Sequence, residues 1–334
     1  MIEQIERLRE IFTSKNSFVI TSHINPDADA LGSETALARF LSDQGKRVII
    51  LNQSETPENL QFLTAVFPIT TYHETHHAQS ILDAECFIVV DTNAVQRFKA
   101  LEHAFRKTKA LKILIDHHLE PEPFADIAIV DFNAPATSEI LFNILTKLDE
   151  QGITPPVAEA LYAGIMSDTG SFKFPLTTAE THRITAALIE RGAQPYKIYQ
   201  QIYESGNLST VHLLGKALES ITLHCNGKVA AMILPQSTFT ETGTKESDVD
   251  NLTQYILTIK NVVLGIVFVE LENAIKISYR SKGNIPVNEA AKLYGGGGHK
   301  NAAGARIKNI SLSEAVNQVL NSVAPFITNS KGIS

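Results

Sequence analysis

The sequence of 334 residues has no tryptophan and only two cysteines, which excludes a disulfide framework. Cys86 and Cys225 are far apart and flank no metal-ligand spacing, so we interpret each as a small buried hydrophobe. No apolar run reaches the roughly 20 residues of a membrane span, and the charged N-terminus has no secretory apolar region. These absences predict a cytoplasmic protein that has no membrane partner.

The sequence also lacks a basic excess, because its net charge is −7. This charge argues against a protein that binds long duplex nucleic acid through a broad basic surface. Basic residues do gather between Ala274 and Lys308, where seven of them accompany one acidic residue, Glu289. The uneven distribution favours a small anionic substrate that is bound in part by basic side chains.

Hydrophobic patterns predict two domains of the α/β class. Short β-rich segments alternate with helical patterns in the first half, which indicates a doubly wound and mainly parallel sheet. The second half contains two hairpin signals, one of them at Asn226-Gly227, and favours a smaller α/β domain with a mixed sheet. We expect domains over 1–195 and 211–330, joined by a linker over 196–210. The expected strands of the first domain are 17–22, 47–51, 85–90, 111–115 and 127–131.

Polar side chains follow the first expected strand at once. His23, Asp27 and Asp29 lie within seven residues, and a helical segment from Glu34 to Gln44 comes next. Open α/β sheets build their ligand sites at the carboxyl ends of the strands. Nitrogen and hard oxygen ligands suit Mn²⁺, Mg²⁺ or a similar ion, so this motif predicts part of a metal site.

Further segments end in the same way. Asp91 closes one apolar strand, Asp116-His117-His118 closes another, and Asp168 follows an apolar helix. Taken singly, such an aspartate is equally typical of a helix N-cap or a turn. Taken together, these carboxylates at one sheet edge would repel one another strongly without a cation. The joint pattern therefore predicts a divalent-metal centre.

These residues resemble the DHH phosphoesterase superfamily, which is named for its Asp-His-His motif. The resemblance implies two divalent cations, most simply Mn²⁺, with Mg²⁺ or Co²⁺ as alternatives. It implies that one ion is held by His23, Asp27 and Asp91, and the other by Asp29, Asp91, His117 and Asp168. It further implies catalytic roles for Asp91 as the bridging ligand, for His118 beside the scissile phosphate, and for Asp116, which orients a neighbouring histidine.

A glycine run in the second half strengthens the resemblance. Residues 295–304 are similar to the glycine-rich motif of the DHH-associated domain, and Arg280-Ser281 also match that domain. Glycine backbone N–H groups approach phosphate closely because no β-carbon intervenes. The resemblance thus makes 1–195 the catalytic domain and 211–330 the substrate-binding domain. Its implied substrate-binding residues are Arg280, Ser281, Gly296, Gly297, Gly298 and His299.

Within the superfamily, the length and domain order resemble the oligoribonuclease (nanoRNase) and pAp phosphatase group. This implies hydrolysis of short RNA or DNA fragments, of about two to five nucleotides, to mononucleotides, and of 3′-phosphoadenosine 5′-phosphate (pAp) to AMP. A hydrolase of cyclic-di-AMP or pGpG is one alternative, and a non-catalytic nucleotide-binding module is another. The sequence leaves the oligomeric state open and is compatible with a homodimer.

Overall fold

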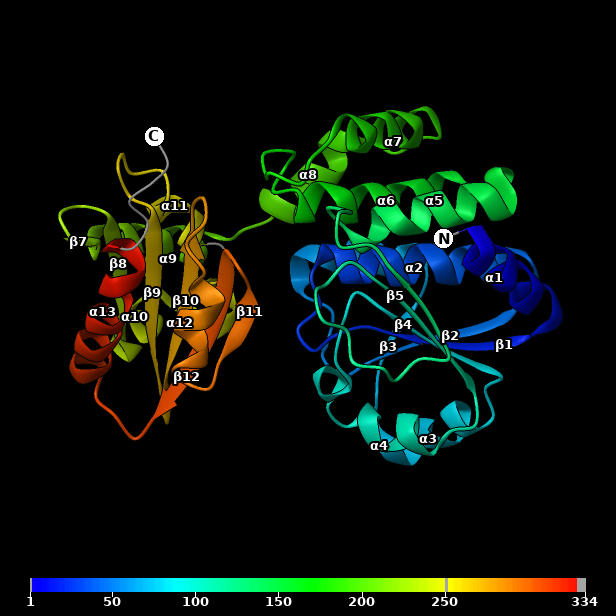
Figure 1. Cartoon of the computed structure of the whole chain (residues 1–334), viewed down its shortest axis with the longest axis horizontal. Helices are drawn as coiled ribbons and strands as arrows, with labels where there is room; N and C mark the ends of the chain where they lie inside the picture. Colours follow the sequence, from blue (N-terminus) through cyan, green and yellow to red (C-terminus); the bar gives the residue numbers. More distant parts are fainter. Residues whose placement is uncertain (1, 250–251, 329–334) are drawn as a thin grey trace. The chain divides into compact units, whose positions relative to one another are not determined.

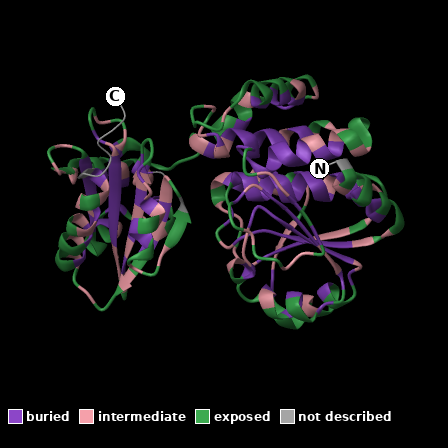
Figure 2. Ribbon diagram, viewed as in Figure 1, coloured by how far each residue is buried: buried purple, intermediate pink, exposed green. Residues whose placement is uncertain are grey.

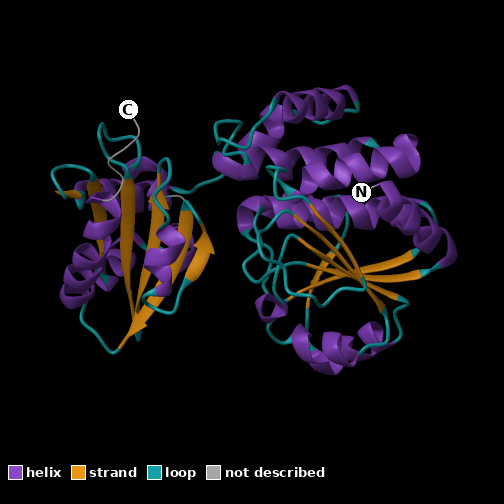
Figure 3. Cartoon of the chain, in the orientation of Figure 1, coloured by secondary structure: helices purple, strands orange, loops and turns teal. Residues whose placement is uncertain are grey.

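Six parallel strands form the centre of the N-terminal part of the chain (Figures 1 and 3). The structure is a computed structural model that describes residues 2–249 and 252–328. The strands lie in the order β3-β2-β1-β4-β5-β6, and every neighbouring pair is parallel. Their bounds are β1 Ser17–Thr21, β2 Arg47–Asn52, β3 Ile69–Thr71, β4 Cys86–Val90, β5 Leu111–Asp116 and β6 Ile127–Val130.

Helices cover both faces of this sheet, as expected for a doubly wound fold (Figures 1 and 2). The apolar core on one face contains side chains of α1, α2, α5, α6, α7 and α8, and the core on the other face contains side chains of α3 and α4. Short 3-10 segments lie at 58–65, 95–98 and 150–152. The helices are α1 Ile2–Ser14, α2 Ala28–Asp43, α3 Glu74–Leu82, α4 Leu101–Lys107, α5 Thr137–Asp149, α6 Pro155–Asp168, α7 Ala179–Glu190 and α8 Pro195–Tyr203.

The C-terminal part holds a second sheet, in the order β11-β12-β10-β9-β8-β7. Its β8 and β9 are parallel and its other pairs are antiparallel, so the sheet is mixed. Helices α12 and α13 cover one face, and α9 and α11 cover the other. The bounds are α9 Leu208–Glu219, β7 Thr222–His224, β8 Val229–Leu234, α10 Gln236–Thr242, α11 Thr253–Ile256, β9 Leu264–Leu271, β10 Ala274–Ser281, α12 Val287–Lys292, β11 Gly297–His299, β12 Ala302–Lys308 and α13 Leu312–Thr328.

The fold class predicted from the sequence is confirmed for both parts, but helix α2 differs from the expectation. It begins at Ala28 rather than at Glu34. The side chain of Asp27 accepts hydrogen bonds from the backbone N–H groups of Asp29 and Ala30, and so caps the helix six residues early. Asp29 therefore lies in the first helical turn and not in a loop.

The chain divides into two compact units between Ser205 and Gly206. Helix α8 belongs to the first unit because Ile198 and Ile202 are part of its core. Most of the expected linker over 196–210 is therefore helical, and only residues 204–207 lie between α8 and α9. No helix in the described part of the chain has the length and apolar character that crossing a bilayer requires.

Helix α2 packs directly on α6 through glycine. A β-carbon at Gly32 would come within 2.4 Å of the carbonyl oxygen of Ala160, which is backbone and has little freedom to move. We expect Gly32→Ala to lower the free energy of unfolding by about 1–3 kcal/mol, because it overpacks this contact. The measurement is thermal and urea unfolding followed by circular dichroism.

The control for this substitution is Gly215→Ala on α9. No atom lies within 4 Å of a β-carbon at this position, so alanine is expected to be neutral or slightly stabilising there. Equal midpoints of thermal and urea unfolding for Gly32→Ala and the wild type would contradict the close α2–α6 contact.

Candidate metal centre

The carboxyl ends of three neighbouring strands carry most of the candidate ligands. β1 pairs with β4 and β4 pairs with β5, all parallel, so their ends lie side by side. His23 follows β1 by two residues, Asp91 follows β4 directly, and Asp116 is the last residue of β5. The edge expected from the sequence thus brings together residues that are more than 90 positions apart in the chain.

Asp29 connects the start of α2 to the start of α5. It is fully buried, and its two carboxylate oxygens accept hydrogen bonds from the backbone N–H groups of Thr137 (2.7 Å) and Ser138 (2.9 Å). These amides belong to the first turn of α5, where no intrahelical acceptor exists. The carboxylate is therefore held in a fixed orientation by backbone rather than by flexible side chains.

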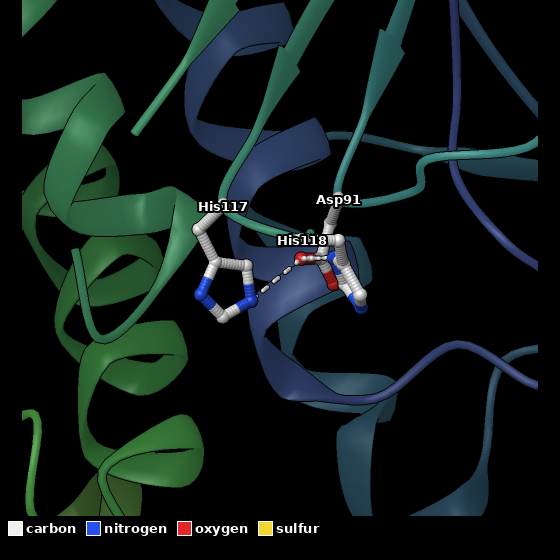
Figure 4. A group of neighbouring side chains, drawn as sticks. All are labelled: Asp91, His117 and His118. Carbon is white, nitrogen blue, oxygen red and sulfur yellow. Dashed lines mark ion pairs between the residues drawn. The ribbon is translucent and has the colours of Figure 1, made fainter. Parts of the chain in front are cut away.

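Asp91 lies at the centre of the cluster (Figure 4). Its oxygens are 3.6 Å from Nε2 of His23, 3.5 Å from Nε2 of His117 and 3.7 Å from Nδ1 of His118. The hydroxyl of Thr137 donates a hydrogen bond to the same carboxylate at 2.9 Å. Asp91 adopts a left-handed backbone conformation (φ 55°), which is uncommon outside glycine and marks a position under constraint.

Asp116 orients His118. Its Oδ1 lies 2.7 Å from Nδ1 of His118 and also accepts the backbone N–H of His117 at 2.9 Å. An ionised carboxylate accepts hydrogen bonds and has none to donate, so the proton of this contact is on Nδ1. Nε2 lies on the opposite side of the ring from this contact. This is the contact that an orienting role for Asp116 requires.

Asp168 reaches the cluster from the end of α6. Its Oδ2 lies 3.2 Å from Nε2 of His117, and about a third of its side chain is exposed. His117 is held on its other side, where Nδ1 lies 3.2 Å from the carbonyl oxygen of Ala134. The structure thus places Asp168, the last residue of α6, beside His117, which directly follows β5.

The candidate ligands form three overlapping groups, and within each the ligand atoms lie within 4.8 Å of one another. One group has the same members as the residues implied for the first ion, a second contains three of the four residues implied for the other ion and lacks Asp91, and the third joins His118 to Asp91 and His117. Imidazole nitrogen and carboxylate oxygen in this proportion suit a divalent cation such as Mn²⁺ or Mg²⁺. The groups are His23 with Asp27 and Asp91, Asp29 with His117 and Asp168, and Asp91 with His117 and His118.

The electrostatics of the imidazoles reflect the surrounding carboxylates. Burial by itself lowers the pKa of His23, but Asp91 and Asp27 outweigh it and raise the pKa to about 9. Burial likewise disfavours the charged form of His117, yet Asp91 and Asp168 raise its pKa to about 9. Without a metal ion, protons supply the positive charge that the carboxylates require.

The pKa values of the buried carboxylates are shifted in opposite directions. Burial and, after it, the charge of Asp91 together raise the pKa of Asp29 to about 7. Burial also raises the pKa of Asp168 well above its usual range, assisted by the charge of Asp29. Burial alone would raise the pKa of Asp91 too, but the imidazoles of His23, His118 and His117 keep it below its usual value. A divalent cation would relieve the repulsion that these acids share, so the cluster fits a metal.

The candidate substrate-binding residues lie in the second unit. Arg280 of β10 and His299 of β11 are both in register with Ala302 of β12, so their backbones form one row across three strands. The side chain of His299 lies outside the described residues. The Ser281 hydroxyl donates to the carbonyl oxygen of Ile285 (2.7 Å) and accepts from the Asn301 amide (2.8 Å).

Two of the candidate glycines are required for close packing of two strands, whereas the expected reason was close approach of a phosphate to their backbone. A β-carbon on Gly296 would come within 2.1 Å of the carbonyl oxygen of Gly304, and one on Gly298 within 2.5 Å of that of Ala302. Both glycines therefore allow β11 to approach β12. Only Gly297 of this group has open space beside its α-carbon.

Sequence reasoning missed two residues that the fold brings to the metal cluster. Thr137 binds Asp91 and Asp29 through its hydroxyl and its backbone amide. Arg97 follows β4; its carbonyl oxygen accepts the backbone N–H of Ile24 (2.8 Å), and its charge lowers the pKa of His23. A threonine at a helix start is an ordinary capping residue, so only its tertiary neighbours reveal the contact with Asp91.

Comparisons with known proteins identify the families that the chain matches. The DHH family N-terminal domain model matches residues 17–165, and the DHHA1 domain model matches residues 226–329. A bifunctional oligoribonuclease and PAP phosphatase NrnA from Bacillus subtilis is 30% identical over 294 residues, covering 87% of this chain and 90% of the relative. The Thermus thermophilus protein of the same name is 27% identical, covering 92% of this chain and 90% of that protein.

A solved structure extends the likeness to the whole backbone. The crystal structure of an exopolyphosphatase-related protein from Bacteroides fragilis superimposes with a TM-score of 0.94, at 28% identity and 98% coverage of each chain. The chain therefore belongs to the DHH family of phosphoesterases and carries a DHHA1 domain in its second half. The resemblance inferred from the sequence motifs is confirmed.

The central position of Asp91 generates a prediction about metal binding. We expect Asp91→Asn to weaken Mn²⁺ binding about 100-fold or more, since even the loss of an outer partner of a metal ligand costs about 10–100-fold. Asparagine tolerates the left-handed backbone at this position, so the fold is expected to persist. Titration calorimetry with Mn²⁺ measures the affinity, and circular dichroism checks the fold.

Asp43→Asn is the matched control for this variant. Asp43 lies at the end of α2 and pairs with Arg39 at the surface, away from the candidate ligands. Unchanged Mn²⁺ affinity in a folded Asp91→Asn protein would refute the assignment of Asp91.

Proposed function

We propose that the chain is a divalent-metal-dependent phosphoesterase that hydrolyses short oligonucleotides to mononucleotides and pAp to AMP. The observation that carries this proposal is the buried cluster of imidazoles and carboxylates around Asp91. The likeness to relatives named oligoribonuclease and PAP phosphatase, which extends over both halves of the chain, supports the choice of substrates. The acidic net charge favours short substrates over long strands.

We assign two Mn²⁺ ions to this cluster as the resident cofactors. His23, Asp27 and Asp91 would hold one ion, and Asp29, Asp91, His117 and Asp168 the other. Ions of this type, when bound, supply a water that is acidic enough to act as a nucleophile near neutral pH and neutralise the charge of the phosphate.

The surrounding residues prepare this chemistry. Asp29 fixes the first turn of α5, and Thr137 in that turn fixes Asp91, so the carboxylates do not reorganise when substrate arrives. Asp116 holds His118 through Nδ1 and leaves Nε2 to face the phosphate. In its protonated form, His118 donates a charge-assisted hydrogen bond to a phosphate oxygen or to the leaving oxygen.

The DHHA1 domain is proposed to bind a second phosphate of the substrate. Arg280 supplies a charged donor, and the space beside the α-carbon of Gly297 leaves room for an anion. We assign His299 to the same phosphate. Ser281, Gly296 and Gly298 shape the site, because the Ser281 hydroxyl is engaged inside the domain and the two glycines pack on β12.

The activity test compares several phosphoesters in one assay with Mn²⁺. We expect the purified protein to convert pApA to mononucleotides and pAp to AMP and phosphate, and to cleave a 20-nucleotide strand much more slowly. Chromatography of the products measures each rate, and Asp91→Asn provides the inactive control. Faster hydrolysis of cyclic-di-AMP than of pApA and pAp would contradict the proposed substrates, and binding of pApA without hydrolysis would refute an enzymatic function.

A second prediction concerns the phosphate anchor. Arg280→Ala is expected to raise KM for pApA about 10- to 100-fold, because a hydrogen bond to a charged group is lost. Mn²⁺ affinity should stay at the wild-type value, since Arg280 belongs to the other unit. Lys308→Ala at the exposed end of β12 is the control for the loss of one positive charge. Loss of Mn²⁺ binding in Arg280→Ala would show that the anchor and the metal site are not separate.

A further inference from the structure

The loop that follows Asp168 has an unusual backbone. Gly170, Ser171 and Phe172 are consecutive and all have positive φ values, of 57°, 58° and 67°. A left-handed conformation is a genuine outlier for a bulky residue, and such strain collects at functional sites. The strained residues lie two to four positions after Asp168, so the loop begins at the metal cluster.

The two phenylalanines of this loop lie in opposite environments. Phe172 packs inward, with its ring centroid 6.1 Å from that of Tyr162 and 5.4 Å from that of His182. Phe174 leaves 49% of its surface exposed. Its backbone N–H nevertheless donates to Thr169 O at 3.0 Å, and its carbonyl oxygen accepts from Thr177 N at 2.9 Å. Phe172 therefore anchors the loop, and the hydrogen bonds hold Phe174 in an exposed position.

The ring of Phe174 lies on the backbone of Gly170. A β-carbon at residue 170 would come within 2.6 Å of the ring, so only glycine lets the ring settle there. The ammonium of Lys173 is 5.7 Å from the ring centroid. The result is an ordered and exposed aromatic surface with an adjacent cation, six residues along the chain from Asp168.

Other large apolar side chains are exposed on the segments that carry the metal cluster. Leu119 follows His118 directly and is 57% exposed. Phe132 is 47% exposed and lies two residues before Ala134, whose carbonyl oxygen contacts His117. Core packing does not account for apolar side chains that point to solvent at these positions.

We propose that Phe174 is a stacking platform for a nucleobase of the substrate. This inference rests on the proposed function and adds a contact to the base, whereas the metal cluster and Arg280 concern phosphate. A base offers a flat π-face that matches an exposed phenyl ring, and the Lys173 ammonium, which lies over the ring, adds a cation for the phosphate backbone. Stacking tolerates every base, so the platform favours nucleotides over simple phosphates without sequence preference.

The experiment compares pApA with two analogues, each of which has one adenine replaced by hydrogen. We expect Phe174→Ala to raise KM for pApA about 5- to 100-fold, the range that one base stack contributes, while kcat changes less than about twofold. One of the two analogues should then show the same KM with wild type and variant, because the base that stacks is missing from it. Phe174→Tyr should retain the wild-type KM, whereas Phe174→Leu should not.

Two controls separate stacking from a structural effect. Mn²⁺ affinity of Phe174→Ala, measured by calorimetry, should equal that of the wild type. Leu82→Ala on α3, where a side chain of comparable exposure (43%) is removed, should leave KM unchanged. Phe174→Leu with a wild-type KM, or equal increases in KM for pApA and both analogues, would overturn the platform.

Binding measurements keep this inference distinct from the proposed function. If the wild type fails to hydrolyse pApA, the proposed function is wrong. Calorimetric binding of pApA then tests the stacking role of Phe174 by itself. A weaker Kd for Phe174→Ala supports the platform even in that case. An unchanged Kd overturns it.

Discussion

Three imidazoles approach one buried carboxylate, that of Asp91, from three directions, at distances between 3.5 and 3.7 Å. Burying a charge in this way is costly unless the surrounding groups compensate for it. The left-handed backbone at Asp91 and the hydroxyl of Thr137 fix the carboxylate between β1 and β5. The parallel register of β1, β4 and β5 is what makes this convergence possible.

The cost of burying carboxylate charge also explains why the first turns of two helices take part in the site. Asp27 caps α2 and Asp29 caps the backbone of α5, so two candidate ligands also satisfy amides that would otherwise lack acceptors. The hydrogen bonds that cap these helices therefore also position the carboxylates. Both helices pack against α6, which carries Asp168 at its end.

Much of this arrangement was predictable from local patterns. Apolar strands that end in Asp91 and in Asp116-His117-His118 indicated one sheet edge, and the Asn226-Gly227 hairpin was recognised from its turn residues. The early start of α2 and the short strands β11 and β12 were not predicted. A side-chain cap outweighed the apolar pattern in the first case, and glycines that look like a loop pair with β12 in the second.

The sequence by itself determined the fold class, the family and the residue types of the cluster, because strand periodicity and closely spaced motifs are local properties of the chain. Only the tertiary structure shows that Thr137 binds Asp91, that Asp116 contacts Nδ1 of His118, and that Phe174 lies exposed on Gly170. These contacts join segments whose proximity depends on strand register, helix packing or a strained turn. No local pattern encodes them, since each residue on its own is typical of an ordinary cap, strand end or loop.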